Sequence, residues 1–140
     1  MHRVVIDTNV IISALRSNKG ASNQFLRMLG KELFECAISV PLILEYEEVC
    51  KRLMPPLGIT NAQIDSFIDY ICQVSLHRQI FYLWRPQLPD ADDDFLLDLA
   101  VEAQADFIIT FNKKDFHGVE RFNIRLATPK EFMQILGVFS

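Results

Sequence analysis

The sequence has too little positive charge to bind a polyanion through a broad basic surface. Its 14 Lys and Arg residues are outnumbered by 18 Asp and Glu residues, which gives a net charge of -4 at pH 7. A protein that binds nucleic acid by neutralising phosphates with Lys and Arg alone needs the opposite balance. A polyanionic ligand would therefore need metal ions or a local basic patch to approach this chain.

Cysteines and long apolar segments are also scarce. The three cysteines, Cys36, Cys50 and Cys72, are odd in number and lack metal-site spacing, so we expect reduced thiols. No apolar stretch is long enough to span a bilayer, and no charged leader precedes a cleavable apolar run. We expect a soluble, cytoplasmic protein.

The composition is nevertheless rich enough in apolar residues for a large core, since 50% of the chain is hydrophobic and 11% is aromatic. Such a composition argues against disorder. No repeat, low-complexity tract or composition shift divides the chain, so we assign a single domain to residues 1–140.

Apolar runs and helical stripes alternate along the whole chain. Strands are expected at residues 3–6, 34–40, 79–83, 106–110 and 124–127. One helix is expected at 9–15, a second ends at Gly30, and a third runs from Pro41 toward Leu53. Three further helices are expected to begin after Thr60, within the acidic cluster 90–94, and after Thr128. Thr60 and Thr128 each stand three residues before Gln or Glu, which is the capping-box pattern. Apolar strands that alternate with helices predict an α/β fold with a mostly parallel sheet covered on both faces.

Acidic residues stand where these strands end or where helices begin. They are Asp7, Glu45, the adjacent pair Asp93 and Asp94, and Asp115. In a parallel sheet these positions share one edge, the edge at which α/β proteins bind ligands. Two like charges about 4 Å apart cost roughly 4 kcal/mol at an effective dielectric of about 20, so several ionised carboxylates need a cation. An all-oxygen set favours Mg²⁺ or Mn²⁺, which can activate water and screen a phosphate.

Each acid also has an ordinary structural explanation. Asp7 could cap the helix behind it, Glu45 could be an exposed helix residue, and Asp115 could stabilise a turn. The cluster 90–94 could complement a helix dipole, and Asp98 could be solvated or support Asp94. The predicted convergence of all four positions at one edge is what favours a site.

The ordered set of these segments resembles the PIN-domain family, including the VapC-like toxin nucleases of bacterial toxin–antitoxin pairs. The resemblance extends over nearly the whole chain and rests on residues 5–15, 39–45, 93–97, 105–110, 114–116 and 127–132. It implies a three-layer α/β/α sandwich that hydrolyses RNA with Mg²⁺ or Mn²⁺. It also implies a small antitoxin partner that binds an apolar groove. Separately, the apolar end, residues 135–139, could pack on the core or form a homodimer contact.

Carried over by position, the resemblance makes Asp7 the first acid, Glu45 the second and Asp94 the third, with Asp93 its close competitor. Many relatives have a fourth aspartate two residues after the strand-end threonine, where this chain has Asn112. Either Asp115 substitutes, or the site holds only one metal firmly. The predicted catalytic and metal-binding set is Asp7, Glu45, Asp94 and Asp115. The residues predicted to support and orient this set are Thr8, Asn9, Asp93, Thr110 and Asn112.

Two other functions stay open. One is an aspartate-nucleophile phosphatase, which also has an aspartate after its first strand. Such enzymes use a second aspartate two positions later as the acid–base residue, and this chain has Asn9 at that position. The other is a PIN-like module that binds RNA or a protein partner and has weak or no catalytic activity. Two features argue slightly for this alternative to the ribonuclease, namely Asn112 and the missing basic surface. Local positive charge could come from Arg16, Lys19, Lys113 and Lys114, which could equally be plain surface residues.

Overall fold

The computed structural model describes residues 1–79 and 91–138, without the side chains of 91–94. Its elements are β1 (Arg3–Ile6), α1 (Thr8–Arg16), α2 (Ala21–Arg27), β2 (Glu35–Ile38), α3 (Val40–Leu53), η1 (Pro55–Leu57), α4 (Asn61–Val74), β3 (Leu76–His77), α5 (Ala91–Glu102), β4 (Phe107–Ile109), η2 (Lys113–Phe116), η3 (Val119–Phe122), β5 (Arg125–Ala127) and α6 (Pro129–Leu136). Within the described ranges, every helix is too short or too polar to cross a membrane.

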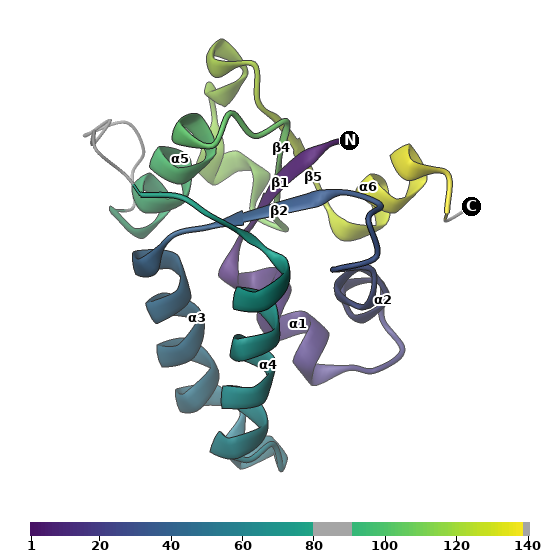
Figure 1. Cartoon of the computed structure of the whole chain (residues 1–140), viewed down its shortest axis with the longest axis vertical. Coiled ribbons are helices and arrows are strands. Elements are labelled where there is room, and N and C mark those ends of the chain that lie inside the picture. The colour runs from purple at the N-terminus through teal and green to yellow at the C-terminus, as the bar shows by residue number, and fades with distance from the viewer. Residues whose placement is uncertain (80–90, 139–140) are drawn as a thin grey trace.

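The described strands form one parallel sheet in the order β3-β2-β1-β4-β5. The chain starts in the middle at β1, extends the sheet through β2 and β3, and returns to the other side of β1 with β4 and β5 (Figure 1). The strand order therefore reverses between β1 and β4. A crevice for ligands forms at such a reversal, outside the carboxyl ends of the strands.

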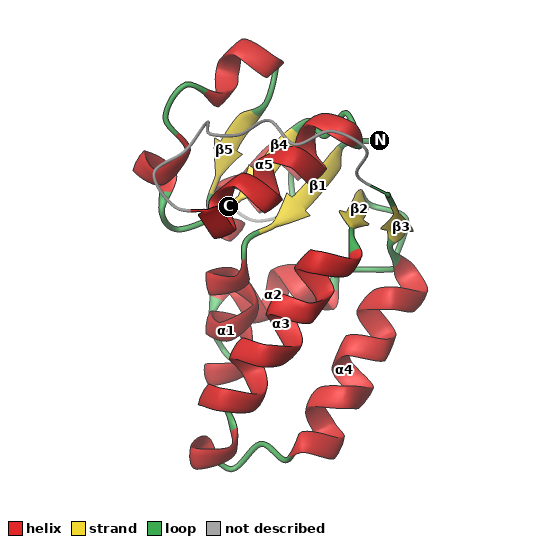
Figure 2. Ribbon diagram, turned by 90° about the vertical axis from the view of Figure 1, so that its left-hand side faces the viewer, coloured by secondary structure: helices red, strands yellow, loops and turns green. Residues whose placement is uncertain are grey.

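Helices cover both faces of this sheet, which is the predicted three-layer α/β/α arrangement. The strands lie between α5, which packs against β1 and β2, and the pair formed by α2 and α6 (Figure 1). Helices α3 and α4 pack side by side and extend, with α1, beyond the edge at which β1 and β2 end (Figure 2).

An aromatic cluster joins the layers on the α2–α6 side. The Phe132 ring of α6 lies 5.2 Å from the Phe107 ring, 5.3 Å from the Phe34 ring and 5.8 Å from the Phe25 ring, between centroids. Phe132 is fully buried, and the other three rings are buried as well. The last helix of the chain thus closes the core around β4 and α2.

Local signals located most of these elements, with one informative exception. The capping boxes at Thr60 and Thr128 are both present. The third strand lies at Leu76–His77, earlier than the predicted 79–83, of which 80–83 lie outside the described residues. A two-residue strand has no periodicity of its own. It exists because Leu76 and His77 pair with Ala37 and Ile38 of β2.

Candidate active site

Asp7 and Thr110 meet where β1 and β4 end, at the reversal of strand order. The Asp7 N–H donates to the Ile109 carbonyl at 2.9 Å, which continues the β1–β4 pairing past both strands. The Thr110 hydroxyl, which is fully buried, donates to Asp7 Oδ2 at 2.7 Å. A pair separated by 103 residues in the chain therefore forms the centre of the site.

Asp7 holds the cap position of α1, but its side chain makes no capping hydrogen bond. The half-buried carboxylate accepts the Thr110 hydroxyl instead. The carboxylate at this cap position thus contacts β4 through Thr110, and it also lies near the N–H groups of Thr8 and Asn9 at the start of α1.

Burial raises the pKa of the Asp7 carboxyl above its ordinary value of 3.8. The hydrogen bond from Thr110 and the nearby N–H groups of Thr8 and Asn9 oppose this rise, whereas the negative charge of Asp115 adds to it. The metal-free site therefore disfavours the ionised form of Asp7. A bound cation would relieve this penalty.

A second hydrogen bond links Glu45 to the same region. The buried Thr8 hydroxyl donates to Glu45 Oε2 at 2.5 Å, so α1 orients a carboxylate of α3. The next residue, Tyr46, is fully buried, and its hydroxyl donates to the Ile6 carbonyl of β1. The residues on both sides of Asp7, Ile6 through its carbonyl and Thr8 through its hydroxyl, thus attach α3 to the end of the first strand.

Asn112 and Asp115 follow β4 in a short, ordered loop. The Asn112 N–H donates to the Thr110 hydroxyl oxygen at 2.9 Å, and the Asp115 N–H donates to the Asn112 carbonyl at 3.0 Å. The Asn112 side chain is exposed, and Asp115 is half-buried and close enough to influence Asp7. Asn9, in the first turn of α1, is half-buried, and its Oδ1 has no partner among the described residues.

The predicted third acid lies in the first turn of α5, which contains Asp93 and Asp94. Their side chains lie outside the described part of the structure. Among the described residues, no three His, Cys, Asp or Glu side chains gather closely enough to hold a metal ion. Completion of the predicted metal site therefore depends on the first turn of α5.

The sequence did not decide whether Asp98 is solvated or supports Asp94. Asp98 lies four residues after Asp94 on α5 and is only 1% exposed, so it is not a solvated surface residue. Its i, i+4 spacing from Asp94 was the available signal. That spacing could not identify the buried side of α5, because leucines surround Asp98 at positions 96, 97 and 99.

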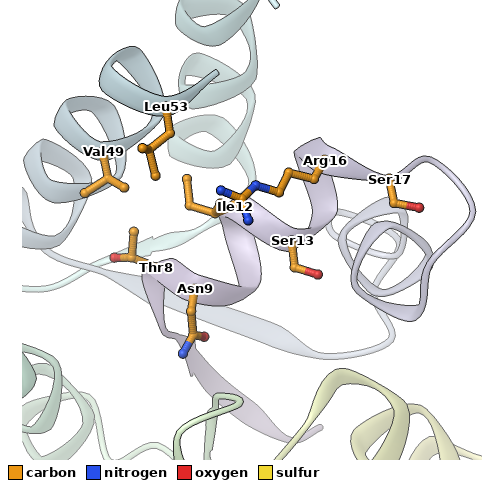
Figure 3. Close-up of a pocket in the computed structure, with 8 residues that line it drawn as sticks. All are labelled: Thr8, Asn9, Ile12, Ser13, Arg16, Ser17, Val49 and Leu53. Carbon is orange, nitrogen blue, oxygen red and sulfur yellow. The ribbon is translucent and has the colours of Figure 1, made fainter. Parts of the chain in front are cut away.

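Two hollows flank α3 beside these residues. One, of about 480 Å³, lies between α1 and α3, with Thr8 and Asn9 at one end and Arg16 and Ser17 at the other (Figure 3). The other, of about 450 Å³, includes Glu45 and Phe95 in its lining. Asp7 is not among the described lining residues of either hollow. Apolar side chains of α3, Val49 and Leu53, form the wall opposite Ile12 in the first hollow (Figure 3).

The two lysines after Asn112 differ in their surroundings. Lys113 Nζ lies 2.5 Å from Glu131 Oε1, and this pairing lowers the pKa of the Glu131 carboxyl. Because Glu131 also completes the capping box of α6, Lys113 attaches the loop to that helix. Lys114 is exposed. Of the basic residues predicted to supply local positive charge, Lys113 is thus held in an ion pair, and Arg16, Lys19 and Lys114 are exposed.

Comparison with known proteins agrees with this architecture. One chain of the "crystal structure of VapBC2 from Rickettsia felis bound to a DNA fragment from their promoter" superposes with a TM-score of 0.61. It is 16% identical, and the match covers 90% of this chain and 98% of that one. No curated protein sequence matches significantly. The PIN-domain profile matches residues 3–114, a range that includes Asp7, Glu45, Asp94 and Asn112. This chain therefore belongs to the PIN-domain family.

Proposed function

We propose that this protein is a divalent-metal-dependent ribonuclease that hydrolyses RNA phosphodiester bonds and acts as the toxin of a toxin–antitoxin pair. PIN domains are generally nucleases, and they typically use divalent metals. The observation that supports the proposal best is the Asp7–Thr110 hydrogen bond at the strand reversal. It places an acid with a raised pKa at the position where this fold class binds ligands.

The available donors suit a hard cation. Carboxylates of Asp7, Glu45 and Asp94, with oxygen from Asp115 or Asn112, would hold Mg²⁺ or Mn²⁺. Cys36 and Cys50 are buried with raised thiol pKa values of about 12 and about 11, so neither offers a thiolate at neutral pH. When bound, the cation would supply an activated water and stabilise the charge of the leaving oxygen.

The protein itself orients these donors. Thr110 directs one Asp7 oxygen through its hydroxyl, and Thr8 does the same for Glu45. The Tyr46 hydroxyl holds α3 against β1, which keeps the Glu45 and Asp7 side chains in register. Hydrogen bonds of this outer type typically account for about 10- to 100-fold in metal affinity or activity. The neutral Asn112 contributes an oxygen without charge, which favours one firmly held ion over two.

A metal titration tests the proposal and identifies the third acid. Isothermal calorimetry with Mn²⁺ should give a binding isotherm for the wild type that Asp94→Asn weakens more than Asp93→Asn does. Asp92→Asn, in the same helical turn, is the matched control and should bind as the wild type. Cleavage of RNA should require Mn²⁺ or Mg²⁺ and stop in excess chelator. An absence of metal binding would favour the non-catalytic binding module instead.

The hollow between α1 and α3 is a suitable place for an antitoxin segment. It is apolar between Ile12 and Leu53, and it runs from Arg16 to Thr8 and Asn9, next to Asp7 (Figure 3). A peptide along it, with an acidic residue beside Arg16, would end at the site and block it. Arg16→Glu should therefore weaken antitoxin capture at least about 10-fold, whereas Arg27→Glu on α2 should not. Equal capture by both variants in a pull-down would contradict this placement.

A homodimer through the carboxyl end stays a prediction. Ile135 and Val138 are exposed there at 46% and 50%, and residues 139–140 lie outside the described range. Sedimentation that shows only monomer would remove it.

A further inference from the structure

Phe111 is an exposed aromatic residue directly beside the candidate active site. It lies between Thr110, which donates to Asp7, and Asn112, and 46% of it is exposed. Among the exposed large hydrophobic side chains of the described residues, only one other is aromatic, Tyr70, and its hydroxyl donates to the Leu29 carbonyl on another part of the molecule. Single exposed apolar residues are common on protein surfaces, so exposure alone is not informative. The informative feature of Phe111 is its position next to the candidate site.

The surrounding loop holds Phe111 in place. On one side, the Thr110 N–H donates to the Ala127 carbonyl at 2.9 Å, and the Thr110 hydroxyl oxygen accepts the Asn112 N–H. On the other side, Lys113 pairs with Glu131, and Phe116 is fully buried in the core. Both flanks are thus fixed to the sheet and to α6, which leaves the Phe111 ring at the surface with little backbone freedom.

Electrostatics alone give this protein a weak hold on RNA. Its net charge is -4, and the acids at the site repel phosphates. Lys113 is exposed but paired with Glu131, and Lys114 is exposed as well. A contact that does not depend on charge would compensate. Aromatic rings provide such contacts because unpaired bases stack on them without sequence preference.

We propose that Phe111 is a stacking platform for an unpaired nucleobase of the RNA substrate, next to the phosphodiester that is cleaved. This assignment rests on the proposed nuclease function and adds a residue that would hold an unpaired base of the RNA. Bases inside a duplex are already stacked on each other and cannot reach the ring. The hydrogen bonds on both sides of Phe111 hold its backbone next to Thr110, whose hydroxyl contacts Asp7.

Binding of a labelled single-stranded oligoribonucleotide tests the proposal, measured by fluorescence anisotropy over a series of salt concentrations. The Asp7→Asn protein serves as the parent, so that cleavage does not interfere. Adding Phe111→Ala should weaken binding about 5- to 100-fold without changing the slope of log Kd against log salt. Adding Phe111→Trp should restore binding. Lys114→Ala should instead reduce the slope by about 0.7, the value for one phosphate contact.

The matched control is Leu57→Ala in η1, because Leu57 is also an exposed apolar residue and lies outside the loop. It should bind as the parent. Duplex RNA of the same sequence should not respond to Phe111→Ala. A change in Kd of less than about twofold for Phe111→Ala overturns the proposal. The proposal is also overturned if Phe111→Trp does not restore binding, or if the Asp7→Asn parent does not bind the RNA. Loss of antitoxin capture with unchanged RNA binding also overturns it, because Phe111 is then a protein contact.

Steady-state kinetics separate this proposal from the nuclease function. In the otherwise wild-type enzyme, Phe111→Ala should raise KM with little change in kcat, since the ring binds the substrate and does not touch the reacting atoms. Metal-dependent cleavage with an unchanged KM would refute stacking and leave the nuclease function intact. Loss of RNA binding in Phe111→Ala, together with no cleavage by any form of the protein, would support stacking and refute the nuclease function.

Discussion

Asp7→Asn is expected to reduce metal-dependent RNA cleavage by more than about 100-fold, beyond the loss typical of residues that only orient metal ligands. The substitution keeps the shape of the side chain, and the amide oxygen can still accept the Thr110 hydroxyl. What it removes is the negative charge at the end of β1. Initial rates with Mn²⁺ give the measurement, and Asp69→Asn on the exposed face of α4 controls for a charge change elsewhere. Undiminished cleavage in Asp7→Asn would contradict the proposed mechanism.

The same substitution should stabilise the metal-free protein. Burial raises the pKa of Asp7 above 3.8, so the folded state holds the proton more tightly than the unfolded state does. The contribution of Asp7 to the free energy of unfolding of the wild type therefore falls as pH rises from 3.8 through the raised pKa, and it levels off above that pKa. Asn carries no such penalty. The stability difference in favour of Asp7→Asn should grow over this window in urea unfolding with chelator present, and a difference that shrinks with pH would be contrary to expectation.

Phe132→Ala is expected to produce the largest loss of stability, about 3–5 kcal/mol in the free energy of unfolding. Its ring is fully buried among Phe25, Phe34 and Phe107, which come from distant parts of the chain. Removing it leaves a cavity between the sheet and α2, lined by rings that lose their edge-to-face partner. Ile135→Ala on the exposed side of the same helix should change stability by less than about 0.5 kcal/mol.

Urea unfolding of both variants measures this difference. Similar losses for Phe132→Ala and Ile135→Ala would mean that α6 is not an integral part of the core. The family profile ends at residue 114, before α6 begins. The experiment therefore also shows how far a segment beyond the matched region contributes to the fold.

Local sequence was sufficient for most elements because each local signal depends on neighbouring residues. The runs at Val4–Ile6 and Phe107–Ile109 are apolar throughout because both strands are covered on two faces. Thr60 and Thr128 satisfy helix-end N–H groups within three residues. β3 could not be found in this way, because its two residues depend on β2 for their pairing.

The sequence by itself determined that acidic residues follow strands of a mostly parallel sheet, because that depends only on the order of elements along the chain. Only the tertiary structure decided that β4 lies beside β1, so that Thr110 reaches Asp7, and that Thr8 orients Glu45. It likewise decided that Lys113 pairs with Glu131 and that Phe111 stays at the surface. The reason is physical: periodicity and capping act over a few residues, whereas strand order and side-chain pairing across more than a hundred residues follow from the packing of the whole core.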